Sequence, residues 1–189
     1  MSDPLADAAR DRLLMLLLEP PSAVRPAALR ELLPSLSEPF ATATDRLAEM
    51  SVAEVEADYH RLLGPTGAVP FCESDLGANA FAKGRLISDV SGFYKAFRYP
   101  ETAEVLDSPD HIAVELGFAA YLAIKQVYAE FLGEPEHVAT AIEAREAFGR
   151  DHLDPFAGRL ASRLAEVAPE DSYYAGVAAL LAARAVHAG

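Results

Sequence analysis

The chain has 189 residues, of which 51% are apolar, and it carries a formal net charge of −13. This length suits one domain with a substantial core, the apolar content excludes global disorder, and the single cysteine excludes an internal disulfide framework. The acidic balance disfavours nucleic acid and anionic membrane surfaces as partners and favours a basic peptide.

Helix signals follow one another through the first half of the chain, and prolines and glycines separate them. They predict helices over residues 4–18, 26–33, 38–50, 52–63 and 80–97. Asp3 and Pro4 open the first helix, and a capping box from Ser51 to Glu54 opens the fourth. Residues 64–79 form the longest predicted loop. Long loops in compact domains tend to carry function.

The second half is dominated by a long apolar stretch that follows Ser108. Ser108 is a good N-cap and Pro109 suits the first helical position, so the pattern predicts a helix from there to about residue 132. This helix is apolar nearly all round, which is typical of the centre of a bundle. Further helices are expected over 136–151, 154–167 and 171–187.

No segment alternates polar and apolar residues as a strand does, and alanine and leucine dominate the chain. We therefore expect a single all-α domain over residues 1–189, a compact bundle of about eight to ten helices. A hinge over 99–108 would separate an N-terminal from a C-terminal lobe and allow helix exchange between protomers. The apolar run at 13–18 is too short for a signal segment and that at 173–183 too short for a membrane span, so we expect a cytoplasmic protein.

Five short motifs occur in order along the chain. They are DYHRLLGP at 58–65, PFCES at 70–74, FYKAF at 93–97, PDH with EL at 109–116, and HLDPF at 152–156. Together they resemble the signatures of the TorD/DmsD family of molybdoenzyme-specific chaperones, which act in redox enzyme maturation. The chain departs from the family pattern at three positions. Cys72 stands where an aromatic residue is usual, Phe156 replaces a tryptophan, and Arg98 replaces the glycine that often follows the Phe-Tyr helix.

The resemblance implies an all-helical cytoplasmic chaperone without catalytic activity. Its partner would be the immature catalytic subunit of a molybdopterin oxidoreductase, together with the twin-arginine signal peptide of that subunit. Binding would support cofactor insertion and delay export. We assign the chain no cofactor and no metal of its own, no nucleic acid and no stable membrane association, and expect a monomer or a helix-exchanged dimer.

A twin-arginine peptide presents two guanidinium groups followed by an apolar stretch, so its receptor needs carboxylates beside an apolar groove. The residues predicted to bind the client combine acids, aromatic rings and the turn before the long helix: Phe71, Glu73, Tyr94, Pro109, Asp110, His111 and Glu115. Asp75 is a further acid nearby, and additional lining is expected from Phe93, Ile112 and Phe118. Glu73 also suits a cap for the helix that follows it.

Structural roles are open for the same residues. Asp110 can simply complement the helix dipole, His111 can pack as a satisfied histidine, and Glu115 can bind a loop amide or His111. His152 and Asp154 flank a helix restart, where local capping is the default interpretation. Cys72 and the core-facing residues of 59–63 are interpreted as packing residues.

Two other functions are open. One is a non-catalytic helical adaptor that binds a mature redox complex. The other is a helical metal-dependent hydrolase, for which Asp110, His111, Glu115, Asp151 and His152 supply ligand types. The Asp-His order is the reverse of the helical phosphohydrolase pattern, and the chain contains no HExxH motif, P-loop or nucleophile elbow.

Overall fold

The protein is all-helical in the computed structural model, which describes residues 3–63, 67–76, 80–100 and 108–187. These ranges contain nine α-helices: α1 (Pro4–Leu18), α2 (Arg25–Leu32), α3 (Phe40–Ala48), α4 (Val52–Leu63), α5 (Ala80–Phe97), α6 (Ile112–Leu132), α7 (Pro135–Phe148), α8 (Asp154–Val167) and α9 (Tyr173–His187). Three short helical turns join them: the 3-10 turns η1 (Leu33–Ser35) and η2 (Glu73–Leu76), and the π-helical turn η3 (Gly149–Leu153). The predicted fold class and helix number are confirmed for this part of the chain.

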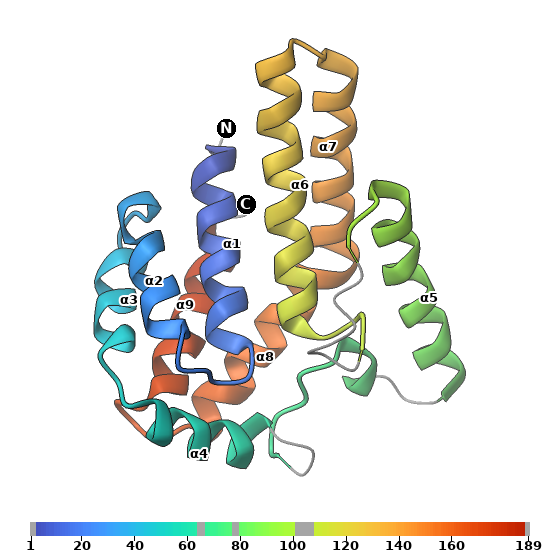
Figure 1. Cartoon of the computed structure of the whole chain (residues 1–189). Helices are drawn as coiled ribbons and strands as arrows, with labels where there is room; N and C mark the ends of the chain where they lie inside the picture. The colour runs from blue at the N-terminus through green and yellow to red at the C-terminus, as the bar shows by residue number, and fades with distance from the viewer. Residues whose placement is uncertain (1–2, 64–66, 77–79, 101–107, 188–189) are drawn as a thin grey trace.

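Helix α6 runs through the middle of the molecule, with α1 packed on one side and α7 on the other (Figure 1). Helices α2 and α3 lie outside α1, α8 and α9 pair with each other, and α4 lies at the base. Helix α5 stands on the opposite side of α6 from α1, so the bundle has one thick side and one thin side.

Local sequence signals explain most helix ends. Asp3 caps α1 by accepting a 2.9 Å hydrogen bond from the Leu5 amide, and Pro4 occupies the first turn. Gly133 ends α6 in the left-handed conformation, at φ 70°. Helices α7 and α8 are not separated by a break: the π-helical turn η3 carries the chain from one into the other.

The core is built from leucines of α1, the N-terminal half of α6, and apolar side chains of α8 and α9. Ile112, Leu116 and Phe118 are completely buried, whereas Ile124 and Phe131 of the same helix are exposed. The central position predicted for the long helix therefore holds for its first half and is wrong for its second. That second half rises with α7 as a hairpin beyond the other helices (Figure 1).

By length and composition alone, α6 is apolar enough to cross a membrane. However, 72% of its most apolar window is buried inside the protein, as expected of a core helix. The predicted hinge over 99–108 falls mainly on residues 101–107, which lie outside the described residues. A single domain and helix exchange therefore stay predictions.

Candidate functional site

Two segments that are far apart in sequence meet at the N-terminal end of α6. The Ile112 amide donates to the Phe71 carbonyl and the Glu73 amide donates to the Asp110 carbonyl, both at 2.9 Å. These bonds form an isolated antiparallel bridge between Cys72 and His111. The bridge carries the loop residues Phe71 and Glu73 to the start of the central helix.

Asp110 fixes this junction. Asp110 is completely buried, and one of its carboxylate oxygens accepts a 2.8 Å hydrogen bond from the Ser74 amide. The Ser108 hydroxyl donates to the other oxygen. Asp110 therefore satisfies a free amide of the η2 turn, as a helix cap does.

The helix starts later than the sequence predicts, because residues 109 and 110 form a turn and α6 begins at Ile112. His111, not Ser108, is the N-cap: its backbone is extended and its Nδ1 accepts a 3.1 Å hydrogen bond from the Ala113 amide. The imidazole also packs on Phe71, with ring centroids 4.9 Å apart. His111 thus has a capping role that its position in the sequence did not indicate.

Glu115 is the least satisfied group of the site. It has 0% exposure, and neither carboxylate oxygen has a hydrogen-bond partner within the described ranges. The carboxyl group of Glu73 lies within reach, but two acceptors can bond only when one of them is protonated. Burial raises the pKa of Glu115 well above its ordinary value, and the nearby Glu73 and Asp110 carboxylates raise it further.

His152 lies on the other side of Glu73. Its Nδ1 is 3.1 Å from Glu73 Oε2, and its Nε2 is 3.4 Å from Asp89 Oδ2 on α5. Burial opposes the charged imidazole, but the hydrogen bond and charge of Glu73, helped by Asp89 and Asp151, outweigh it and raise the pKa of His152. Among the described residues, no side chain donates or accepts a capping hydrogen bond at the start of η3 or α8, so the predicted role of His152 as a local helix cap is wrong.

The π-helical turn explains why the sequence did not place His152 in the client-binding site, although His152 belongs to the HLDPF motif. A π turn inserts one extra residue into a helical turn and so re-aims the side chains that follow, and such turns recur at functional sites. In η3 it points His152 between Phe93 and Phe148, at ring-centroid distances of 5.8 and 5.4 Å. No periodicity in the sequence marks this shift. Asp89 and Ser74 were missed for a similar reason, since only the fold brings them here.

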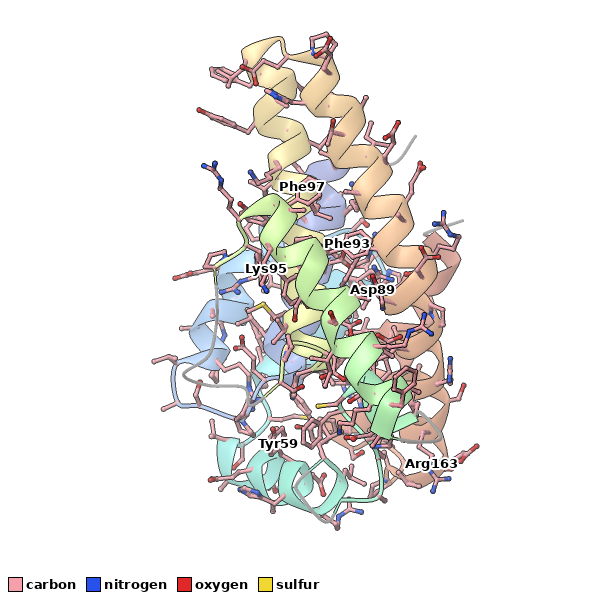
Figure 2. The ribbon with its side chains drawn as sticks, turned by 90° about the vertical axis from the view of Figure 1, so that its right-hand side faces the viewer. Tyr59, Asp89, Phe93, Lys95, Phe97 and Arg163 are labelled. Carbon is pink, nitrogen blue, oxygen red and sulfur yellow. The ribbon has the colours of Figure 1, made fainter. Side chains whose placement is uncertain are left out.

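An open cleft of about 650 Å³ leads to His152 and Glu73 between α5 and η3. It is lined by Glu73, Phe81, Ala82, Arg85, Leu86, Ser88, Asp89, Asp151 and His152. Figure 2 looks onto α5, and Asp89 and Phe93 lie along that helix beside the ribbon of α7 and η3. The cleft gives solvent access to the edge of the buried acid cluster.

An aromatic cluster forms the apolar wall behind the acids. Tyr94 packs on Phe118 and Tyr99, at centroid distances of 4.8 and 5.2 Å, and its hydroxyl donates to the Pro109 carbonyl at 2.8 Å. Burial raises the pKa of Tyr94, so this hydroxyl stays protonated and acts as a fixed donor. Of the further lining predicted here, Phe93 is partly buried, whereas Ile112 and Phe118 are completely enclosed.

Within the described ranges, no three side chains of ligand type converge in a way that would hold a metal ion. The acid cluster therefore offers hydrogen-bond acceptors and negative charge, arranged beside aromatic rings. This chemistry suits recognition of a cationic group.

A family model described as "Nitrate reductase delta subunit" matches residues 24–162. The chain belongs to this family. Its members are redox enzyme maturation chaperones of the TorD/NarJ type, which serve molybdoenzymes and are not a catalytic family. No curated protein and no solved structure was found to match the chain.

The match confirms the family predicted from the five motifs, all of which lie inside the matched range. Four of these motifs contribute residues to one place in this chaperone fold: the loop at 70–74, the pair Phe93 and Tyr94, the turn and helix start at 109–116, and His152. Helices α1 and α9 lie outside the matched range, although both pack into the core.

Proposed function

We propose that this chain is a cytoplasmic chaperone that binds the immature catalytic subunit of a molybdopterin oxidoreductase, including its twin-arginine leader. Binding holds the subunit while its cofactor is inserted and delays its export. The observation that carries this proposal is the buried acid cluster that opens into a cleft beside an aromatic wall. A net charge of −13 also steers a cationic leader toward the protein.

The seven residues predicted to bind the client differ in exposure, and this suggests two kinds of contribution. Phe71, Glu73, Tyr94 and Pro109 are partly exposed, so they are the groups that we propose to contact the client. Asp110, His111 and Glu115 are buried. In this proposal these buried residues do not contact the client. They hold the loop in place and supply negative charge to the site.

Peptide binding tests the leader part of the proposal. A synthetic peptide with two adjacent arginines followed by an apolar stretch is titrated into the purified protein by fluorescence anisotropy. Glu73→Gln and Asp110→Asn keep side-chain shape and remove one negative charge each, and we expect each to weaken binding by about tenfold. The matched control is Asp45→Asn, an exposed acid on α3 away from the site. Equal affinities for all four proteins would contradict the proposal.

The client itself is tested by affinity capture from the native cytoplasm, with mass spectrometry of the bound proteins. Recovery of an immature molybdopterin oxidoreductase subunit with its leader attached is the expected result. Recovery of only the mature complex would support the adaptor function instead. The acidic composition does not separate these two functions, so the state of the captured partner decides between them.

A further inference from the structure

Exposed apolar side chains gather on one part of the molecule. Of the seven large apolar side chains that are exposed in the described ranges, five belong to the second half of α6 or to the facing end of α1: Leu5, Ile124, Tyr128, Phe131 and Leu132. Phe131 is the most exposed of them, at 85%. The end of α6 rises with α7 beyond α1, so α1 does not cover it there (Figure 1). Apolar exposure gathered in this way marks a surface that binds another macromolecule.

Five positions of α6 form a single stripe that is small at one end and large at the other. Gly117, Ala120, Ile124, Tyr128 and Phe131 are spaced by three or four residues, so they share one side of the helix. We call this stripe the α6 face. Ile124 is its midpoint, because the small residues precede it by seven and four positions and the aromatic residues follow it by four and seven.

A groove of about 750 Å³ lies over the small end of the α6 face. Helix α1, which runs antiparallel to α6, contributes Arg12 and Met15 to its lining, and Tyr99 contributes an aromatic ring (Figure 1). A Cβ at Gly117 would stand 2.5 Å from the Tyr99 hydroxyl and 2.9 Å from the Met15 sulfur, so glycine leaves room for both groups. The groove is open to solvent and large enough for aromatic side chains from a partner.

We propose that two copies of this chain pair through the α6 face, as an antiparallel two-fold dimer centred on Ile124. Both helices rise by about 1.5 Å per residue, so positions at equal distances before and after Ile124 lie opposite each other. Tyr128 of one copy then meets Ala120 of the other, and Phe131 meets the groove over Gly117. Each large residue meets a small one, and Ile124 meets its own copy. This pairing needs no exchange of helices.

The groove carries a positive charge without a carboxylate partner. Arg12 is exposed, and its Nη1 donates to the Met15 sulfur at 3.1 Å, which is a weak acceptor. Glu19 is close enough for the charge of Arg12 to lower its pKa against the effect of burial, but the two form no ion pair in the described structure. Arg12 is therefore available to a carboxylate from a second copy.

The large end of the α6 face carries the matching negative charge. Glu134 follows Phe131 by three residues, and its Oε2 lies 2.8 Å from Nδ1 of exposed His137, its one ion-pair partner within the described ranges. When Phe131 enters the groove of a second copy, Glu134 comes to Arg12 of that copy. The two-fold symmetry forms this pair twice. Lys125 stands at the edge near the axis, beside the Tyr121 ring of its own chain, so its ammonium can stay in solvent.

Sedimentation velocity of the full chain over a micromolar concentration series measures the pairing. The buffer contains about 0.15 M salt, which screens the repulsion between two chains of net charge −13. We expect a reversible monomer–dimer equilibrium. Ile124→Glu and Ile124→Lys should each weaken it at least about a hundredfold, because like charges then meet on the axis. An equimolar mixture of these two variants should dimerise again. Val24→Glu, at an exposed apolar position outside the face, is the control.

Two further sets of variants test the contacts on either side of the axis. Phe131→Ala should weaken pairing about tenfold or more, whereas Phe81→Ala, at the other highly exposed phenylalanine, should leave it unchanged. Arg12→Glu and Glu134→Arg should each weaken pairing. Combining both substitutions in one chain reverses each ion pair and should restore most of the affinity.

The outcomes decide the proposal. A protein that stays monomeric at every concentration would overturn it. A dimer that is insensitive to Ile124→Glu and Phe131→Ala would use another surface, such as exchanged helices, and the pairing proposed here would be wrong. If the two Ile124 variants do not dimerise when mixed, Ile124 does not face its own copy. Ile124 and Phe131 are exposed, so circular dichroism verifies the folding of their variants before sedimentation.

Discussion

At the scale of single residues, Glu115 is a completely buried acid in the first turn of the central helix. Burial and the Glu73 and Asp110 carboxylates raise its pKa in the folded protein above the value of 4.5 expected in the unfolded chain. Folding therefore holds a proton that unfolding releases. The stabilising contribution is complete below pH 4.5 and is lost as pH rises toward the folded-state pKa.

Glu115→Gln should remove this pH dependence. The amide resembles the protonated acid in shape and can donate to Glu73, so the variant should be more stable than the unchanged protein at pH 8 and similar to it near pH 4.5. One linked proton changes the free energy of unfolding by at most about 1.4 kcal/mol per pH unit. Urea denaturation across this pH range measures the slope. Exposed Glu136→Gln on α7 is the control, and equal slopes in all three proteins would contradict the prediction.

The sequence identified the acids of the site but not their neighbours. Asp110, Glu115 and Glu73 belong to recognisable motifs, and the structure brings them together. Their local roles depend on hydrogen bonds between segments that are more than thirty residues apart, such as the bond from the Ser74 amide to Asp110. Asp89 belongs to none of the five motifs, and only the folded structure shows that it lies beside His152 of η3.

At the scale of elements, α5 depends more on its own helix propensity than the other long helices do, because only Val90 is fully buried within it. Gly92 is exposed, and a Cβ added there would meet nothing within 4 Å. Gly92→Ala should therefore raise the free energy of unfolding by about 0.5–1 kcal/mol, measured by urea denaturation.

Gly133 is the matched position, where substitution by alanine should lower the free energy of unfolding instead of raising it. A Cβ there also meets nothing, but the residue has φ 70°, and Glu134 N–H donates to the Ala129 carbonyl at 3.0 Å to close the left-handed turn. Gly133→Ala should cost about 1–2 kcal/mol through backbone strain alone. If both substitutions moved stability in the same direction, the conformational argument would be wrong.

Helix boundaries were predictable where capping and proline signals are local. The ends of α5 and α8 fall where the sequence places them, at residues 80–97 and 154–167. The start of α6 was misplaced, because Ser108 and Pro109 form a good capping pair but their turn is held by Asp110 and the η2 segment. The π-helical turn η3 was missed because its extra residue has no compositional signal.

At the scale of the whole molecule, one buried arginine connects the two ends of the chain. Arg184 of α9 donates through Nε to Asp11 of α1 at 2.7 Å and through a terminal nitrogen to Asp154 of α8 at 2.5 Å. The side chains of Arg184 and Asp11 are almost completely buried, whereas Asp154 is partly exposed. Both terminal helices lie outside the matched family range, and this contact ties them to each other and to α8, which begins inside that range.

Removing one partner of such a pair leaves an uncompensated charge in the core. Arg184→Met should lower the free energy of unfolding by about 3–5 kcal/mol, because Asp11 would stay buried without its donor. Adding Asp11→Leu removes that charge and should recover most of the loss, because an apolar pair of similar volume replaces the ion pair. Urea denaturation of the two single variants and the double variant completes the cycle. A double variant less stable than Arg184→Met would show that the arginine acts through its packing rather than by compensating Asp11.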